Sequence, residues 1–170
     1  SQSGHVQVAR RGYFEGGSSR PHDYLLKDPT VIAADIAREP GVVEVMGRLS
    51  FFGLLNNGRA DLPVIGNGIE PDKERRLGTS LTIVAGRHLA AGDAFGILVG
   101  QGVAHALKLA PGSRVTLLAS TVDGAMNSFD AQVVGVFQTI SKEYDARGVL
   151  LTLGAAQDLV GTPAINVLVV

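Results

Sequence analysis

The chain has 170 residues, 45% of them hydrophobic and 18% charged, with a formal net charge of −1. A chain of this length buries a core of its own, and the absence of a basic run excludes a typical nucleic-acid-binding protein. It contains no cysteine, which excludes thiolate catalysis, disulfides and cysteine-ligated metals. The sequence contains no run of about 18 apolar residues that would predict a membrane span. Its first residues lack the charged-then-apolar order of a signal peptide.

The first part of the chain predicts a strand, a loop and a helix. Residues 5–10 alternate apolar and polar side chains, and residues 11–27 are rich in glycine and serine, which is typical of a strand followed by a loop. Asp28 and Pro29 occupy the N-cap and first helical position of a helix that residues 40–41, Pro-Gly, would end. Helical spacing places four apolar side chains on its core-facing side: Val31, Ile32, Ala33 and Ile36.

A β-hairpin is the clearest prediction for the middle of the chain. Residues 42–55 predict a long strand that is interrupted by two glycines, and residues 57–58 are Asn-Gly, the dipeptide that tight hairpin turns prefer. We therefore expect residues 48–55 and 60–69 to pair antiparallel.

After the hairpin, the chain alternates short helices and short strands. The segment 70–77 predicts one helical turn, and its basic cluster Lys73–Arg76 indicates a solvated turn rather than a phosphate site. Two further helices are expected at 101–109 and 154–162. Further strands are expected within 81–93 and at 95–99, 114–120, 128–140, 147–153 and 165–170. This mixture is neither a regular βαβ alternation nor all-β, so the predicted fold class is α+β.

The segment "ILVGQGVAH" has the layout of a dinucleotide-binding loop, in which a strand leads through Gly100 and Gly102 into a helix. The sixth position of that fingerprint needs a small residue, whereas this chain has His105, and the following helix is short for a crossover. Asp123 lies at the distance of a ribose-binding acid but in a turn. We therefore interpret the two glycines as the end of a strand, followed by a helix whose Val103, Ala104, Leu107 and Leu109 are buried.

Other candidate chemistry is sparse. The four histidines His5, His22, His88 and His105 have no metal-ligand spacing, and no Gly-x-Ser-x-Gly nucleophile elbow occurs. Glu143 and Asp145 could form a carboxylate pair, but the pattern favours a charged loop tip. The residues alone therefore predict no catalytic site, no cofactor and no metal, and leave open whether the domain binds a ligand or is a structural element.

Six segments, in order, resemble the periplasmic core domain of MacB-type ABC transporter permeases, a group that includes LolC, LolE and FtsX-like permeases. The segments are "SGHVQV", "IAREPGVVEVMGRL", "VIGNGIEPDKE", "IVAGRHLAAGD", "GILVGQGVAHALKLAPGSRVTLL" and "AQVVGVFQTISKEYDARGVLLTLGAAQDLVG". The resemblance implies an α+β fold with two subdomains. Residues 1–48 and 147–170 would form a βαβ-type Porter-like part, whose second half would continue after Val170, and residues 49–146 an inserted, mostly β Sabre-like part.

The resemblance also implies a function without chemistry of its own. The domain would stand on the periplasmic face of the bacterial inner membrane, as part of an integral membrane protein, and would pass on conformational change driven by ATP. Its implied partners are a cytoplasmic ATPase subunit or domain, a second permease protomer, and a periplasmic adaptor or lipoprotein carrier. The resemblance is compatible with two kinds of transport, efflux and lipoprotein release.

Residues 49–57, "LSFFGLLNN", are a candidate partner contact, because Phe51, Phe52, Leu54 and Leu55 are apolar on both sides of the strand. The alternative is that both sides are buried in the Sabre-like core. Two other functions stay open: a free-standing soluble ligand-binding domain, which needs a pocket of at least about 300 Å³, and a hydrolase that uses Asp145 and a histidine.

Overall fold

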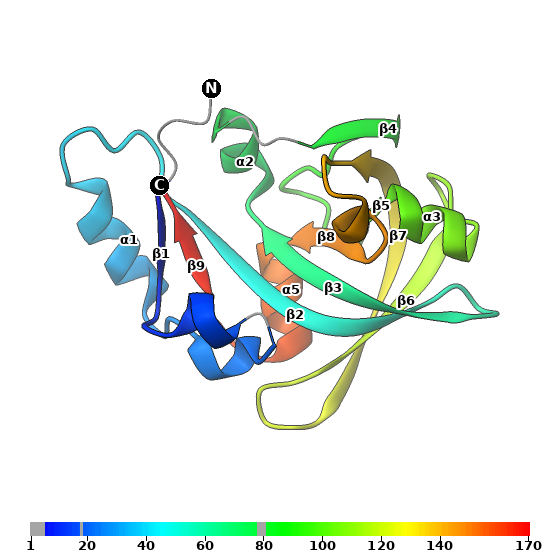
Figure 1. The fold of residues 1–170 in the computed structure, drawn as a ribbon, viewed down its shortest axis with the longest axis horizontal. Coiled ribbons are helices and arrows are strands. Elements are labelled where there is room, and N and C mark those ends of the chain that lie inside the picture. Colours follow the sequence, from blue (N-terminus) through cyan, green and yellow to red (C-terminus); the bar gives the residue numbers. More distant parts are fainter. Residues whose placement is uncertain (1–5, 18, 78–80) are drawn as a thin grey trace.

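The computed structural model describes residues 6–17, 19–77 and 81–170. A twisted β-sheet dominates the fold, with short helices around it (Figure 1). The strands are β1 (Gln7–Ala9), β2 (Met46–Asn56), β3 (Asp61–Ile69), β4 (Thr82–Gly86), β5 (Gly96–Gly100), β6 (Arg114–Ser120), β7 (Met126–Gln138), β8 (Gly148–Thr152) and β9 (Val167–Val169). The helices are α1 (Pro29–Ala37), α2 (Pro71–Leu77), α3 (Gln101–Leu107), α4 (Lys142–Asp145) and α5 (Leu153–Val160), with a π-helical turn η1 (Tyr13–Gly17) and a 3₁₀ helix η2 (Pro21–Tyr24). This arrangement confirms the predicted α+β class.

Six strands pair in a closed ring, in the order β2-β3-β8-β5-β7-β6 and back to β2. The β3–β8 and β5–β7 pairs are parallel, and the other four are antiparallel. Closure gives every strand of the ring a neighbour on both sides, which is how barrels protect the hydrogen-bonding groups of their strands. Only the first part of β7, residues 126–131, pairs with β6 alone among the described strands. β4 extends the sheet from the end of β7.

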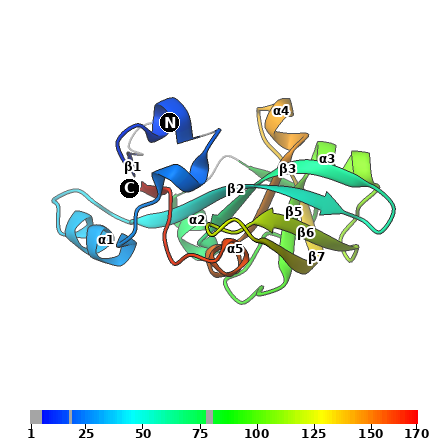
Figure 2. The same ribbon diagram turned by 90° about the horizontal axis from the view of Figure 1, so that it is seen from below.

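Alternating side chains of the six strands fill the barrel, as the two-residue period of a strand requires. On β6, for example, Val115, Leu117 and Ala119 are buried while Arg114 and Ser120 are exposed. α3 directly follows the end of β5, and α5 directly follows the end of β8. Because β5 and β8 are antiparallel, these two helices cover opposite ends of the barrel. Figure 2 shows α3 and α4 on one side and α5 on the other.

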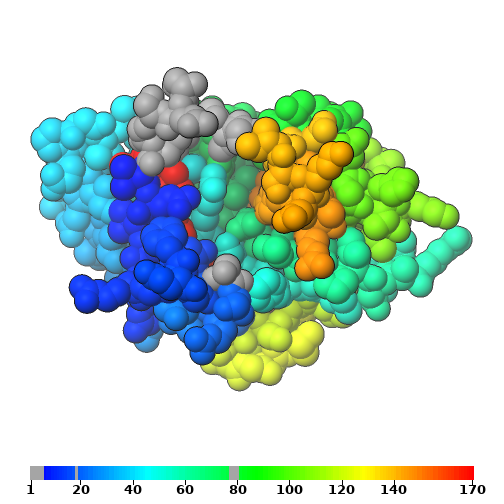
Figure 3. Space-filling model, in the orientation of Figure 1, coloured from blue at the N-terminus to red at the C-terminus, as the bar shows by residue number. Residues whose placement is uncertain are grey.

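A smaller ladder adjoins the barrel. β9 pairs with β1 on one side and with the first three residues of β2, Met46–Arg48, on the other. Ile32, Ala33 and Ile36 of α1 pack against Ile165 and Leu168, but α1 has no fully buried residue. In the space-filling view, α1 and the loop after it project at the left margin of the molecule (Figure 3).

The predicted hairpin is confirmed, with Leu49 opposite Gly68 and Asn56 opposite Asp61. Three local predictions were wrong. The long strand begins at Met46 rather than at residue 42, and the predicted loop at 11–27 contains η1 and η2. Val31 does not face the core: it is 62% exposed. The side chains by which α1 contacts the ladder are Ile32, Ala33 and Ile36, and Val31 lies outside this narrow face.

Of the two boundaries predicted between the subdomains, one falls inside a strand of the sheet and the other falls just before a strand. The first, between residues 48 and 49, lies within β2, and the second, between residues 146 and 147, directly precedes β8. β8 pairs with β3 and β5 of the ring. The division into a Porter-like and a Sabre-like part stays a prediction.

Candidate functional site

The two glycines that resemble a nucleotide loop lie where the backbone of α4 approaches the start of α3. A Cβ on Gly100 would collide with the carbonyl oxygen of Asp145, and one on Gly102 would lie 2.6 Å from the Cα of Ala146. The main chain of α4 therefore fills the space that a pyrophosphate would need. Our reason for rejecting the nucleotide loop was wrong in one respect: His105 is exposed and does not separate the helix from the strand. The expected burial of Val103, Ala104 and Leu107 is confirmed, and Leu109 is partly buried.

Asp145 has a structural role rather than the catalytic one considered for it. Its side chain is buried and accepts three hydrogen bonds from Thr139: two from the backbone N–H (2.9 and 3.0 Å) and one from Oγ1 (2.7 Å). These bonds fasten the end of β7 to α4. The prediction of a charged loop tip was therefore wrong for Asp145, although Glu143 is exposed.

The described histidines are not grouped around a carboxylate. The ring of His22 bonds to the carbonyl of Ser120 and that of His88 to the carbonyl of Leu89, whereas His5 lies outside the described residues. Within the described ranges, no cluster of three or more histidine, aspartate and glutamate side chains could hold a metal ion.

A small polar cavity of about 260 Å³ lies between β2, β3, α2 and α4. Its polar side chains bind one another: Arg48 forms a two-bonded ion pair with Glu74 (both 2.7 Å), and Asn67 Nδ2 donates to the Tyr144 hydroxyl (3.3 Å). Burial is the main cause that raises the pKa of Tyr144 above its ordinary value, so the hydroxyl stays protonated at neutral pH. The cavity is smaller than a typical ligand pocket and its charges are already paired, which disfavours a ligand-binding site here.

The same ion pair belongs to a junction at the start of β2, where the strand leaves β9 and enters the barrel. Glu74 is 2% exposed, and its partner Arg48 is on β2. Glu70 Oε2 accepts the backbone N–H of Gly47 (2.8 Å), and Lys73 Nζ donates to the carbonyl of Val45 (3.1 Å). α2 and the residue preceding it therefore bind the chain at Val45, Gly47 and Arg48, where β2 begins. The prediction that Lys73–Arg76 form a solvated turn was wrong for Lys73 and Glu74.

Asn166 holds the junction from the side of β9. It is fully buried; its Oδ1 accepts the backbone N–H of Ser50 (2.6 Å), and its Nδ2 donates to the carbonyl of Pro21 (2.8 Å). Its own N–H donates to the carbonyl of Arg48 (2.9 Å). One side chain thus connects β2, η2 and the segment before β9, three parts of the chain that are distant in sequence. No sequence pattern indicated this residue.

Residues 49–57 are buried on one face of the strand only. Phe51 and Leu55 are buried in the barrel core, whereas Phe52 is 47% exposed and Leu54 is half-buried on the outer face. Because alternate residues of a strand face opposite sides of a sheet, the interpretation that both faces are buried was wrong. The apolar side chains of this strand that remain accessible on the outer face are Phe52 and Leu54.

The family model of the MacB-like periplasmic core domain matches residues 1–170. The chain belongs to this family. Its fold is similar to the extracellular domain of the noncanonic ABC-type transporter YknZ from Gram-positive bacteria, with a TM-score of 0.68, 14% identity and coverage of 98% of this chain and 82% of that one. It is also similar to the periplasmic region of MacB from Actinobacillus actinomycetemcomitans, with a TM-score of 0.67, 14% identity and coverage of 97% and 72%. No curated protein sequence matches the chain.

The family resemblance identified from the six sequence segments is thereby confirmed. Within the described parts of this MacB-like domain, no helix is long and apolar enough to cross a membrane. The features that the structure adds are the fastened start of β2 and the exposed outer face at Phe52, both of which depend on pairing between distant segments.

Proposed function

We propose that this MacB-like domain is the extracytoplasmic part of an ABC transporter permease and passes ATP-driven motion from the membrane to the periplasm without catalysing a reaction. ATP would be hydrolysed by a cytoplasmic ATPase subunit or domain, and the moving unit would contain two permease protomers. The domain would act as a rigid body whose displacement is the output. Close packing suits this role, because a densely packed interior transmits strain.

The junction at the start of β2 is the observation that carries this proposal. The two ends of the described chain lie together on the small ladder, where Val6 and Val170 exchange two backbone hydrogen bonds (3.1 and 2.8 Å). A force applied at these ends reaches the barrel through β2, the strand shared by the ladder and the ring. Asn166, Glu70 and Glu74 prevent this strand from bending at the point where it passes between them. The barrel would consequently move together with the ladder.

The second part of the proposal is a contact with a periplasmic partner, an adaptor or a lipoprotein carrier, through Phe52 and Leu54. These side chains lie on the outer face of the barrel and pair across the sheet with Ile65 and Pro63 of β3. Aromatic and aliphatic side chains that stay accessible on a rigid sheet can bury apolar area on binding at little cost in conformational entropy.

Rigidity can be tested by distance measurement, because the chain has no cysteine and spin labels can be placed at chosen positions. Labels at Ala34→Cys on α1 and Gln138→Cys on β7 report the distance between ladder and barrel. We expect a narrow distribution by pulsed electron paramagnetic resonance, broadened by Asn166→Ala. Asn127→Ala is the matched control, since the Asn127 amide binds the end of α5 and not the junction. An equally narrow distribution in Asn166→Ala would contradict the role of the junction.

Transmission itself is tested in the whole transporter that carries this domain, reconstituted with its ATPase. ATP should change the distance between labels on the barrels of the two protomers. We expect Asn166→Ala to reduce this change while ATP hydrolysis continues. A parent transporter whose two barrels keep one distance through the ATPase cycle would refute the proposal.

A further inference from the structure

The first part of β7 has an open hydrogen-bonding edge. Residues 126–131 pair with β6 on one side, and the described strands leave their other side unpaired. β5 occupies that side only from Gln132 onward, where the Phe95 carbonyl accepts the backbone N–H of Gln132 (2.9 Å). Such an edge presents backbone donors and acceptors to any extended chain that lies alongside it. The proposed function assigns it no role.

Three residues of this segment direct their backbone groups toward the open side. Both the N–H and the carbonyl of Val133 bond to the residues just before β6 (2.8 Å each), and the β6–β7 register then runs without a shift to the start of β7. Because the backbone groups of an antiparallel strand alternate between its two sides, those of Met126, Ser128 and Asp130 point away from β6. The Ser128 N–H binds the side chain of Asn127 (2.9 Å), whereas no described residue bonds to the N–H or carbonyl of Asp130.

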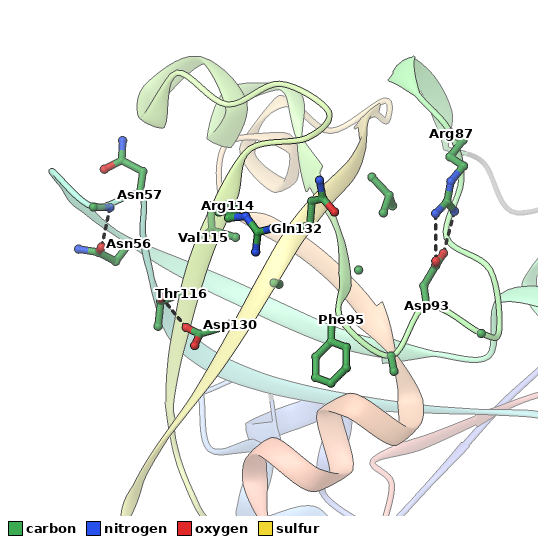
Figure 4. Close-up of a pocket in the computed structure, with 16 residues that line it drawn as sticks. Asn56, Asn57, Arg87, Asp93, Phe95, Arg114, Val115, Thr116, Asp130 and Gln132 are labelled. Carbon is green, nitrogen blue, oxygen red and sulfur yellow. Dashed lines mark hydrogen bonds and ion pairs between the residues drawn. The ribbon is translucent and has the colours of Figure 1, made fainter.

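The edge is accessible and lacks the devices that usually prevent strand addition. Met126, Ser128 and Asp130 are exposed. Natural edges are protected by proline, lysine or a bulge, and residues 126–131 contain none of these. An open cavity of about 1010 Å³ adjoins the edge, lined by residues of β7 that include Asp130 and by residues before β5 that include Phe95 (Figure 4). A ligand can therefore reach the backbone of Asp130.

The chain before β5 is fixed in a conformation that leaves this edge uncovered. Asp93 binds Arg87 twice (2.7 and 3.0 Å) and accepts the backbone N–H of Ala90 (2.7 Å). The Gly96 N–H donates to the Asp93 carbonyl (3.3 Å). These bonds hold residues 90–96 in turns, so β5 begins at Gly96 and does not extend along the rest of β7.

The side chains that flank the edge differ between the two faces of the strand. On the core-facing side, the ring of Phe129 stacks on that of Phe95 with centroids 6.3 Å apart, and Phe95 is 71% exposed. The outer face carries Met126, Ser128 and Asp130. Because alternate side chains of a strand face opposite sides, an added strand would place every second side chain on the side of the aromatic pair and the others on the side of Asp130.

The surroundings of the edge are acidic. Asp123 lies in the turn between β6 and β7, Asp130 lies on β7, and Asp158 lies on α5, where its carbonyl is 3.5 Å from Nδ2 of Asn127. All three carboxylates are exposed, and none forms an ion pair with a described residue. The one basic side chain of β6, β7 and α5 is Arg114, at the start of β6. A positively charged partner is therefore complementary to this edge.

These charges select among the possible occupants. Two copies of this chain that paired through the edge in antiparallel fashion about Ser128 would set Met126 opposite Asp130 and bring the carboxylates of both copies together. Like charges that face each other across an interface oppose association. A lipid chain has no donor or acceptor for the backbone groups of the edge. A basic extended polypeptide satisfies both the backbone groups and the carboxylates.

We propose that residues 126–131 of β7 bind an extended, basic segment of a partner polypeptide by strand addition. Its apolar side chains would lie on the side of Phe95 and Phe129, and its basic side chains beside Asp130. The backbone of the segment would bond to the N–H and carbonyl of Asp130, and the segment would span about six residues, the length of the open edge. The inference does not depend on the transmission of motion or on the contact proposed for the outer face of β2.

The test is a titration of the isotope-labelled 170-residue chain with a short synthetic peptide, blocked at both ends, in which lysine and valine alternate. NMR should show saturable amide shifts centred on residues 126–131. The amide of Asp130 faces the open side, so its hydrogen should exchange more slowly in the complex by about tenfold or more. The amides of Asn127 and Phe129 face β6 and should change little.

Ser128→Pro is the variant that blocks the edge. The proline ring would stand on the open side, and the lost N–H is not part of the β6–β7 ladder, so the domain should fold while peptide binding weakens by about tenfold or more. Ser128→Ala is the matched control, because it leaves the backbone of the edge unchanged and should bind as the parent does. Asp130→Asn should weaken binding less and reduce its dependence on salt.

Four results would overturn the inference. Two are the absence of shifts at millimolar peptide and equal binding of a peptide in which glutamate replaces lysine. The third is binding that Ser128→Pro leaves intact although its spectrum shows a folded protein. The fourth is a dimer that forms without peptide and that Ser128→Pro dissociates, which would identify a second copy as the occupant. None of these results affects the distance measurements at the junction, so the two proposals are tested separately.

Discussion

The barrel and the small ladder are joined by one strand but are stabilised differently. In the barrel, six strands, α3 and α5 enclose one continuous core that includes Phe51, Leu117 and Leu151. The ladder has only three strands, two of them three residues long, and the helix that packs on it, α1, has no buried residue of its own. A closed sheet buries one face of every strand in its own interior. The stability of a short open ladder depends instead on the elements that pack against it. We infer that most of the folding free energy resides in the barrel and that the ladder is ordered through the junction.

The largest expected effect is a core truncation in the barrel. Leu117 is fully buried between β2 and β7, so Leu117→Ala should lower the free energy of unfolding by about 3 kcal/mol through lost burial and a cavity. Ile36→Ala in α1 removes a side chain that is only partly buried and should cost about 1 kcal/mol. Urea unfolding of both variants measures the difference. Equal losses would mean that the two regions share one core.

A glycine substitution at the α3–α4 contact should come next. Gly100→Val forces a side chain against the backbone of Asp145 and should destabilise the domain by about 2 kcal/mol, because main chain yields less readily than a side chain. Gly154→Ala is the matched control: nothing lies within 4 Å of the added Cβ in the first turn of α5. That variant should be stabilised by about 0.5 kcal/mol, since alanine restricts the unfolded chain. Thermal unfolding should show a lowered midpoint for Gly100→Val and a raised midpoint for Gly154→Ala. A Gly100→Val variant as stable as the parent would show that α4 can move away from α3.

The smallest expected effect is pH-dependent and concerns the ion pair between Arg87 and Asp93, in the segment between β4 and β5 and outside both cores. The hydrogen bonds from Arg87 are the main cause that lowers the pKa of Asp93 below its ordinary value. The pair therefore stabilises the folded state above the pKa of an unfolded aspartate, about 4, and this contribution disappears as the pH falls through the lowered pKa. Arg87 is largely exposed, so the contribution is less than about 1 kcal/mol.

Asp93→Asn should accordingly be slightly less stable than the parent at neutral pH, with a difference that decreases in acid and in high salt. Urea midpoints at neutral and acidic pH check this expectation. A difference that grows in acid would have the wrong sign for a carboxylate whose pKa is lowered on folding.

Local signals predicted most of the elements. Asn57-Gly58 predicted the hairpin, and proline and glycine marked both ends of α1. Where predictions were wrong, a distant segment was responsible. Asp145 is polar and lies in a segment that also contains Lys142, Glu143 and Arg147, which is typical of a solvated turn. However, α4 packs against α3, and Thr139 satisfies the carboxylate. The outer position of Phe52 likewise follows from the pairing of β2 with β6, more than sixty residues later in the chain.

The amino-acid sequence by itself determined the fold class, most of the strands and helices, the family and the absence of a nucleotide loop, because each depends on residues that are close in the chain. Only the tertiary structure decided that β6 returns to β2 and closes the ring and that Asn166 connects three separate segments. Strand pairing is specified by the fit of side chains across many residues of separation, and alternation along a single strand shows which face is apolar but not which strand lies beside it.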